Sequence, residues 1–145
     1  MAFLIDTNIL LRALQPHHPH CAHAERAVTA LRSRKEVLHV AAQNLIEFWA
    51  AATRPAGENG LGMSIEAVIQ ELTAIKRLFS LLPEIPVLKE WEQLVATYSI
   101  LGRGTHDARL AAPMKLQGIS HILTFNADDF NRYRDIVVVD PMTVR

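Results

Sequence analysis

Short apolar runs alternate along the chain with longer stretches in which apolar residues recur every three or four positions. Four runs, Ala2–Ile5, Val37–Ala41, Ile119–Phe125 and Ile136–Val139, are predicted strands, and Leu78–Leu82 is a candidate for a fifth. The longer stretches predict helices over residues 9–14, 20–34, 44–54, 64–77, 87–101 and 105–117. Strands that are apolar throughout and are separated by helices indicate an α/β fold, with a parallel sheet covered on both faces.

Several polar residues near the predicted helix starts have a structural explanation. Ser64 and Thr105 are expected to cap the helices that follow them. Asn44 and Glu47 have the spacing of a capping box, and Asp107 suits the positive end of a helix dipole. Helix stability alone is therefore one explanation for Glu47 and for Asp107.

Composition limits the class of protein. A length of 145 residues (16.2 kDa) predicts one domain spanning residues 1–145, and 50% apolar with 21% charged residues excludes a disordered chain. The 15 basic residues balance the 15 acidic ones, so the formal net charge is zero. Because sequence-independent affinity for nucleic acid comes mainly from excess Lys and Arg, any nucleic-acid role must be local.

Cysteine usage and the N-terminal sequence bear on location. Cys21 is the single cysteine, so no intramolecular disulfide can form. The N-terminus lacks the pattern of a signal peptide, and no apolar window is long enough to span a membrane, so we expect a cytoplasmic protein. His17, His18, His20 and His23 surround Cys21, but no second ligand pair follows, and we expect a solvated turn rather than a zinc site.

Carboxylate and amide side chains follow predicted strands or open predicted helices at four places: Asp6, Glu47, Asp107 and the group Asn126, Asp128 and Asp129. The functional edge of a parallel sheet lies at the carboxyl ends of its strands, so we expect these four segments to converge there. Asp6, which has apolar neighbours on both sides, would be costly to bury without a partner.

Converging carboxylates repel one another unless a cation lies between them. An all-oxygen ligand set without thiolates favours Mg²⁺ or Mn²⁺. Such ions serve phosphoryl chemistry by activating an attacking water and by neutralising the phosphate and the leaving oxygen. The sequence therefore predicts metal-dependent hydrolysis of a phosphodiester.

Four motifs follow one another along the chain: Leu4-Ile5-Asp6-Thr7-Asn8, Asn44-Leu45-Ile46-Glu47-Phe48-Trp49, His106-Asp107-Ala108-Arg109-Leu110, and Leu123-Thr124-Phe125-Asn126 continuing to Asp129-Phe130. In order and spacing they resemble the PIN-domain ribonucleases, and among these the VapC-type toxins of bacterial toxin–antitoxin pairs. The resemblance covers essentially the whole chain. It implies a single PIN domain, a three-layer α/β sandwich with a central parallel sheet of four to five strands, and RNA cleavage that depends on Mg²⁺ or Mn²⁺.

The resemblance also implies roles for individual residues. Asp6, Glu47 and Asp107 match the family's core acids and would be both catalytic and metal-binding, while the supporting polar positions are Thr7, Asn8 and Thr124. Many relatives carry a fourth acid where this chain has Asn126, an uncharged oxygen donor that we include among the catalytic residues. Asp129, three residues farther on, is the remaining candidate metal ligand. The uncharged residue argues against a tightly held second metal.

Basic residues in or near these segments are candidates for contacts with RNA phosphates: Arg12, Arg54 and Arg109, with Arg103 and Lys115 nearby. His106 could act as a general base, but a metal that ionises water makes one unnecessary. The resemblance further implies a homodimer and a cognate antitoxin whose C-terminal segment fills the acidic groove.

Large apolar side chains on the predicted helices have a simpler explanation. We expect Trp49 and Trp91, and the apolar stripe between Ile65 and Ile75, to belong to the core rather than to an RNA or partner surface.

Three other functions compete with that of a nuclease. A phosphate-receiver domain needs a central acceptor aspartate, but no Asp lies between Asp6 and Asp107. A haloacid-dehalogenase-like phosphatase needs a second Asp where this chain has Asn8. A catalytically weak or silent PIN-fold module that binds RNA or a partner remains the alternative, with Asn126 in its favour and the three retained acids against it.

Overall fold

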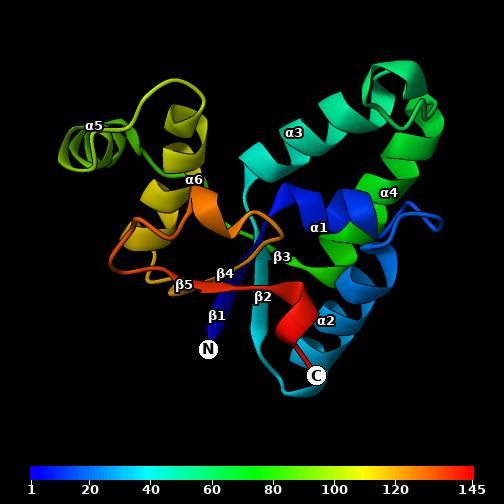
Figure 1. The fold of residues 1–145 in the computed structure, drawn as a ribbon, viewed down its shortest axis with the longest axis horizontal. Coiled ribbons are helices and arrows are strands. Elements are labelled where there is room, and N and C mark those ends of the chain that lie inside the picture. Colours follow the sequence, from blue (N-terminus) through cyan, green and yellow to red (C-terminus); the bar gives the residue numbers. More distant parts are fainter.

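The computed structural model describes residues 1–145 as five strands and six α-helices (Figure 1). The strands are β1 (Ala2–Ile5), β2 (Val37–Val40), β3 (Ser80–Leu81), β4 (His121–Leu123) and β5 (Val137–Val139). The helices are α1 (Thr7–Arg12), α2 (Cys21–Ser33), α3 (Ala42–Thr53), α4 (Ile65–Leu78), α5 (Leu88–Thr97) and α6 (Gly104–Leu116). Short 3-10 turns occupy Ala56–Glu58, Ala127–Asp129 and Pro141–Thr143.

The five strands form one parallel sheet in the order β3-β2-β1-β4-β5. β1 lies at the centre, where Leu4 is opposite His39 of β2 and Ile122 of β4. The predicted parallel sheet is therefore confirmed. The candidate fifth strand is present as β3, but it is shorter than predicted because α4 continues through Leu78.

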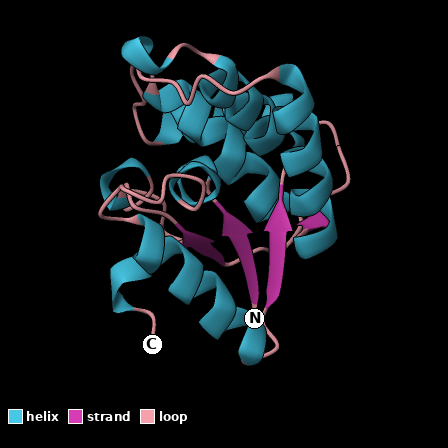
Figure 2. Ribbon diagram, turned by 90° about the vertical axis from the view of Figure 1, so that its right-hand side faces the viewer, coloured by secondary structure: helices cyan, strands magenta, loops and turns pink.

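Helices cover both faces of the sheet and divide the core into two clusters. Phe3 and Ile5 of β1 pack with buried residues of α1, α2, α3 and α4, whereas Leu4 packs with α5 and α6. Alternate strand residues point to opposite faces, so one short strand serves both clusters. In Figure 1, α5 and α6 lie to the left of the strands and α2 and α4 to the right, and Figure 2 shows the strands between helices. The three-layer sandwich is confirmed.

The structure corrects two predictions about helix starts. Helix α3 begins at Ala42, and the Asn44 Oδ1 accepts the backbone N–H of Ala41 at 2.8 Å, so Glu47 lies in the second turn and forms no capping box. Thr105 does not cap α6, because its hydroxyl donates to the carbonyl of Gly102 at 2.7 Å and the helix begins at Gly104. Helix stability therefore does not explain Glu47.

The Ser64 cap is confirmed, since its hydroxyl accepts the N–H of Ala67 at 3.1 Å. The stripe on α4 is only partly in the core: Val68 and Ile75 are buried, whereas Ile65 and Ile69 are 57% and 50% exposed. Trp49 packs against the cluster that contains Phe3 and Ile5, and Trp91 packs against the cluster that contains Leu4, as predicted.

No helix has the length and apolar character needed to span a membrane.

Candidate active site

Asp6 lies directly after β1, at the point where the order of strands reverses between β1 and β4. Crevices at such reversals are the usual sites of parallel α/β folds. The backbone N–H of Asp6 donates to Leu123 of β4 at 3.0 Å, which fixes the residue at the sheet edge. Its carboxylate accepts three hydrogen bonds: from the Thr7 N–H at 2.8 Å, the Thr124 hydroxyl at 2.7 Å and the Asn8 amide at 3.3 Å. Asp6 is only 8% exposed.

Glu47 points from α3 toward the same crevice, and both of its carboxylate oxygens are held. Oε2 accepts the hydroxyl of Thr7 at 2.8 Å, and Oε1 accepts the Nε2 of Gln43 at 2.7 Å. The Thr7 hydroxyl in turn accepts a hydrogen bond from the buried Asn44 amide at 3.2 Å. Thr7 therefore connects the start of α1, next to Asp6, with the acid of α3.

Asp107 lies in the first turn of α6, on the other side of the crevice from α1. The preceding residue, His106, uses its backbone carbonyl to accept the Nε2 of Gln43 at 2.9 Å, and its side chain is exposed. Arg109, one turn on, donates to the Oε1 of Gln43 at 2.9 Å. The start of α6 is thus joined to α3 through one glutamine side chain.

Two acids of the crevice, Asp6 and Asp107, have raised pKa values. Burial raises the pKa of Asp6 from 3.8 to about 6, and the charges of Glu47 and Asp129 add to this, while hydrogen bonds from Thr124 and Thr7 oppose it. Burial likewise raises the pKa of Asp107 to about 6, with further increases from Asp129, Asp6 and Glu47. Ionised, the four acids form a concentration of negative charge that a cation would stabilise.

Asp129, rather than Asn126, adds charge to this cluster. The negative charge of Asp129 raises the pKa of both Asp6 and Asp107, although Asp129 lies in the 3-10 turn beyond β4. Asn126 is exposed, and its backbone N–H donates to the Thr124 hydroxyl at 3.0 Å, while its side chain makes no hydrogen bond. Asn126 therefore helps to orient the hydroxyl that holds Asp6.

Asp6, Glu47, Asp107 and Asp129 fit a hard divalent ion in donor type and charge, because all are carboxylates and each has at least one oxygen with a lone pair free of hydrogen bonds. No three Asp, Glu, His or Cys side chains in the structure are close enough to hold one ion together. Mg²⁺ commonly binds through one or two carboxylates and retains waters in its remaining positions. The arrangement suits an ion bound in that way.

The predicted RNA-binding residues lie in different surroundings. Arg12 donates a hydrogen bond to Gln15 at 2.7 Å. Arg54 is exposed at the end of α3, and Arg109 is exposed although it donates a hydrogen bond to Gln43. Lys115 pairs with Glu90 at 2.9 Å. These contacts leave Arg54 and Arg109 the more accessible of the predicted set.

The histidine-rich turn is a helix start, as predicted. No three of its side chains are close enough to bind one metal ion together, and the Nδ1 of His18 accepts the backbone N–H of His20 at 3.0 Å. The His20 ring stacks on Phe125, with centroids 4.3 Å apart. The turn therefore packs beside the segment that follows β4.

Two residues of the site were missed in the sequence. The spacing in the sequence does indicate Gln43, because a residue four positions before Glu47 lies next to it on the same face of a helix. Arg132, whose charge lowers the pKa of Asp107, lies in a polar turn, and no pattern in the sequence points to it.

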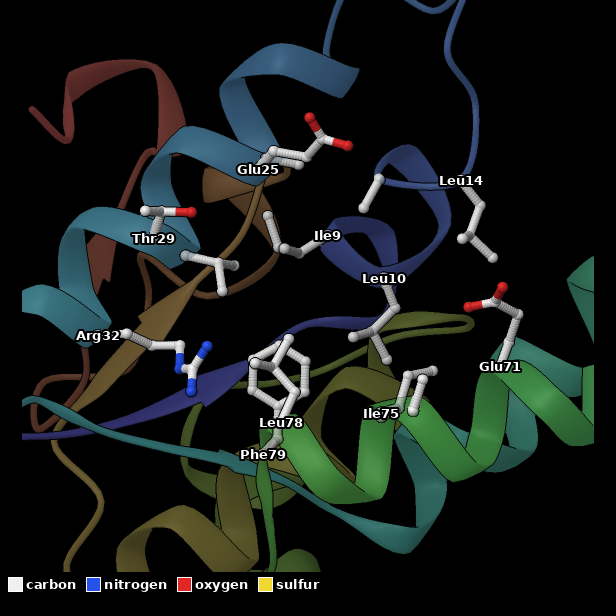
Figure 3. Close-up of a pocket in the computed structure, with 14 residues that line it drawn as sticks. Ile9, Leu10, Leu14, Glu25, Thr29, Arg32, Glu71, Ile75, Leu78 and Phe79 are labelled. Atoms are coloured by element: carbon white, nitrogen blue, oxygen red, sulfur yellow. The ribbon is translucent and has the colours of Figure 1, made fainter.

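A separate apolar groove lies between α1, α2 and α4. Its volume is about 410 Å³, and 10 of its 14 lining residues are hydrophobic. Figure 3 shows Leu10, Leu14, Ile75 and Leu78 around it, with Glu25, Arg32 and Glu71 among the polar residues of its lining. The groove shares α1 with the acidic crevice but none of the acids.

Solved structures of other proteins share this fold. Solved structures similar to this chain include VapBC2 from Rickettsia felis bound to a DNA fragment from their promoter (14% identity, TM-score 0.71, covering 97% of this chain and 98% of that one). FitAcB from Neisseria gonorrhoeae is 20% identical (TM-score 0.66, 97% and 99% covered). VapC20 from Mycobacterium tuberculosis, a Sarcin-Ricin loop cleaving toxin, is 19% identical (TM-score 0.58, 88% and 92% covered).

No curated protein matches the sequence. A family model of the PIN domain matches residues 3–136, which include all of the acids described above. Together with the parallel three-layer sandwich and the acidic crevice at its strand reversal, this match shows that the chain belongs to the PIN-domain family.

Proposed function

We propose that this chain is a divalent-metal-dependent endoribonuclease and the toxin of a toxin–antitoxin pair. The observation that carries the proposal is the cluster of Asp6, Glu47, Asp107 and Asp129, whose carboxylates come from four separate segments of the chain. A fold alone does not need to bring four acids together at such a cost in repulsion. A bound cation removes that repulsion.

In this proposal Asp6, Glu47 and Asp107 hold Mg²⁺ or Mn²⁺ partly through the ion's retained waters, because no three side chains are close enough to bind it directly. Asp129 adds the fourth negative charge. A bound ion would ionise an attacking water and neutralise charge on the scissile phosphate. Thr7, Asn8 and Thr124 orient the carboxylates of Asp6 and Glu47, because all the contacts they make to these groups are donated hydrogen bonds. Asn126 acts at the mouth of the crevice as an uncharged donor or acceptor.

RNA is the proposed substrate. VapC20, a structure of the same fold, is named for cleaving an RNA loop. Arg54 is exposed just after the end of α3, and Arg109 is exposed in α6, half a turn beyond Asp107, so each can contact an RNA phosphate. With a net charge of zero, RNA binding should depend on these local charges and on the bound metal.

The test is cleavage of single-stranded RNA by the purified, partner-free protein. We expect cleavage with Mg²⁺ or Mn²⁺ and none in excess EDTA. Asp6→Asn and Asp107→Asn should each lower the rate by at least about a hundredfold, because each removes a ligand. Asp128→Asn is the matched control, since Asp128 is exposed and is not among the charges that shift the pKa of Asp6 or Asp107. Cleavage that persists in EDTA, or in both site variants, would contradict the proposal.

The partner in this proposal is an antitoxin. The solved structures of the same fold include complexes named VapBC, and the apolar groove offers a place for one amphipathic helix of such a protein. Mixed charges at the rim, Glu25, Arg32 and Glu71, would pair with the polar side of that helix. The antitoxin's C-terminal segment and the homodimer implied by the resemblance remain predictions.

The alternative function is a silent PIN-fold module that binds RNA or a partner. Asn126 favours it, because an uncharged residue replaces an acid. The cleavage assay separates the two, since a silent module would bind RNA without cutting it.

A further inference from the structure

Gln43 lies between Glu47 and the start of α6, and its side chain makes three hydrogen bonds. Its Nε2 donates to the Oε1 of Glu47 at 2.7 Å and to the carbonyl of His106 at 2.9 Å, while its Oε1 accepts Arg109 at 2.9 Å. The residue is 9% exposed. Both amide protons are therefore used, and the buried amide is satisfied on both sides.

Only one orientation of the Gln43 amide satisfies these partners. A guanidinium can only donate, and an ionised carboxylate and a carbonyl can only accept. A flipped amide would place its NH₂ against Arg109 and its oxygen against Glu47 and the His106 carbonyl. The three partners therefore fix which end of the amide faces Glu47, independently of how the atoms are assigned.

This arrangement connects two of the acids. Gln43 is bonded to the carboxylate of Glu47 and to the peptide that immediately precedes Asp107. Thr7 donates a hydrogen bond to Oε2 of Glu47, and Gln43 donates one to Oε1, so the carboxylate is held from two sides. A side chain held in this way keeps one rotamer.

We propose that Gln43 is a positioning residue that fixes the carboxylate of Glu47 relative to Asp107 for binding the divalent ion. This inference rests on the proposed metal-dependent function. Gln43 acts through Glu47 and needs no contact with the ion or the RNA. Arg109 supports it by holding the amide in the productive orientation.

The test measures metal affinity directly, by titrating Mn²⁺ into the RNA-free protein in a calorimeter. Gln43→Met keeps the volume of the side chain and removes its donors, and we expect it to raise the Mn²⁺ dissociation constant about tenfold, as loss of an outer-shell partner commonly does. Glu47→Gln should also weaken binding. The double variant should bind no more weakly than Glu47→Gln alone, because Gln43 has nothing left to position.

Gln117→Met is the matched control, since Gln117 also donates to a carbonyl, that of Pro83 at 3.2 Å, but touches none of the acids. Its Mn²⁺ affinity should equal that of the wild type. An unchanged affinity in Gln43→Met, or an equal further loss in the Glu47→Gln background, would overturn the role of Gln43 while leaving the nuclease intact. No Mn²⁺ binding by the wild type would overturn the proposed function and this role together.

A measurement on the wild type covers the case in which Gln43→Met does not fold. In the nuclear magnetic resonance spectrum the side-chain NH₂ of Gln43 should be protected from exchange with water and should shift as Mg²⁺ is added. The NH₂ of Gln70, an exposed residue of α4, should do neither. A Gln43 signal that behaves like that of Gln70 would contradict the proposal.

Discussion

At the scale of single residues, the acids of the crevice reduce the stability of the metal-free protein. The pKa of Asp107 rises from 3.8 to about 6 on folding, so the folded chain binds its proton more tightly than the unfolded chain. The stability from that proton is fully present below about pH 4 and is lost as the pH rises through about 6. Asn at this position mimics the protonated acid. We therefore expect Asp107→Asn, at about pH 8 in EDTA, to be more stable than the wild type by about 1–2 kcal/mol, allowing for partial exposure.

Urea unfolding at several pH values measures this difference, which should shrink toward zero near pH 4. Added Mg²⁺ should narrow it at high pH by stabilising the wild type alone. Asp128→Asn should show no such dependence on pH. A variant that is less stable than the wild type throughout would mean that Asp107 makes structural contacts that outweigh the repulsion.

At the scale of elements, α3 must end sharply, because the helix carries Glu47 in its second turn and the chain turns back toward α4 after Thr53. Gly60 lies in that turn and donates to the carbonyl of Pro55 at 3.1 Å. A Cβ at Gly60 would lie 2.0 Å from the carbonyl oxygen of Arg54, which is backbone and cannot move aside. We expect Gly60→Ala to destabilise the protein by about 1–3 kcal/mol in urea unfolding.

Gly57→Ala is the control, because a Cβ at Gly57 meets nothing within 4 Å and the residue lies in the same turn. Its free energy of unfolding should stay within about 0.5 kcal/mol of the wild type. Equal losses in the two variants would show that the turn, rather than the close approach to Arg54, limits stability.

At the scale of the whole molecule, the acidic crevice and the apolar groove meet at α1, so one partner could cover both. The proposed function predicts that expression of the chain alone in a bacterium arrests growth and that its cognate antitoxin relieves the arrest. Leu78→Glu places a charge in the groove at a residue already 39% exposed, and cells carrying this variant should stay arrested when the antitoxin is present.

Leu101→Glu is the control, since Leu101 is 85% exposed and lies outside the groove. Cells carrying it should recover with the antitoxin, as those with the wild type do. Recovery of the Leu78→Glu cells would show that the groove does not bind the antitoxin.

The sequence by itself determined the order of strands and helices, the parallel sheet and the convergence of Asp6, Glu47 and Asp107. Apolar periodicity and the geometry of parallel strands are properties of short segments, so they can be seen without knowing what packs against them. Short-range spacing also gave two wrong predictions. Glu47 and Thr105 have the spacing of capping residues, but in the structure Glu47 accepts the hydroxyl of Thr7 and Thr105 donates to the carbonyl of Gly102.

Tertiary structure alone decided which groups hold the acids. The side chain of Gln43 forms hydrogen bonds with His106 and Arg109, which lie 63 and 66 positions farther along the chain. The charge of Asp129, rather than a group of Asn126, raises the pKa of Asp6 and Asp107. Local pattern does not encode such contacts, because hydrogen bonds and charge repulsion depend on distances of a few ångströms that are set when α3 and α6 pack on opposite faces of the sheet. The sequence therefore specified the acids of the site, and the packing of the helices specified how they are held.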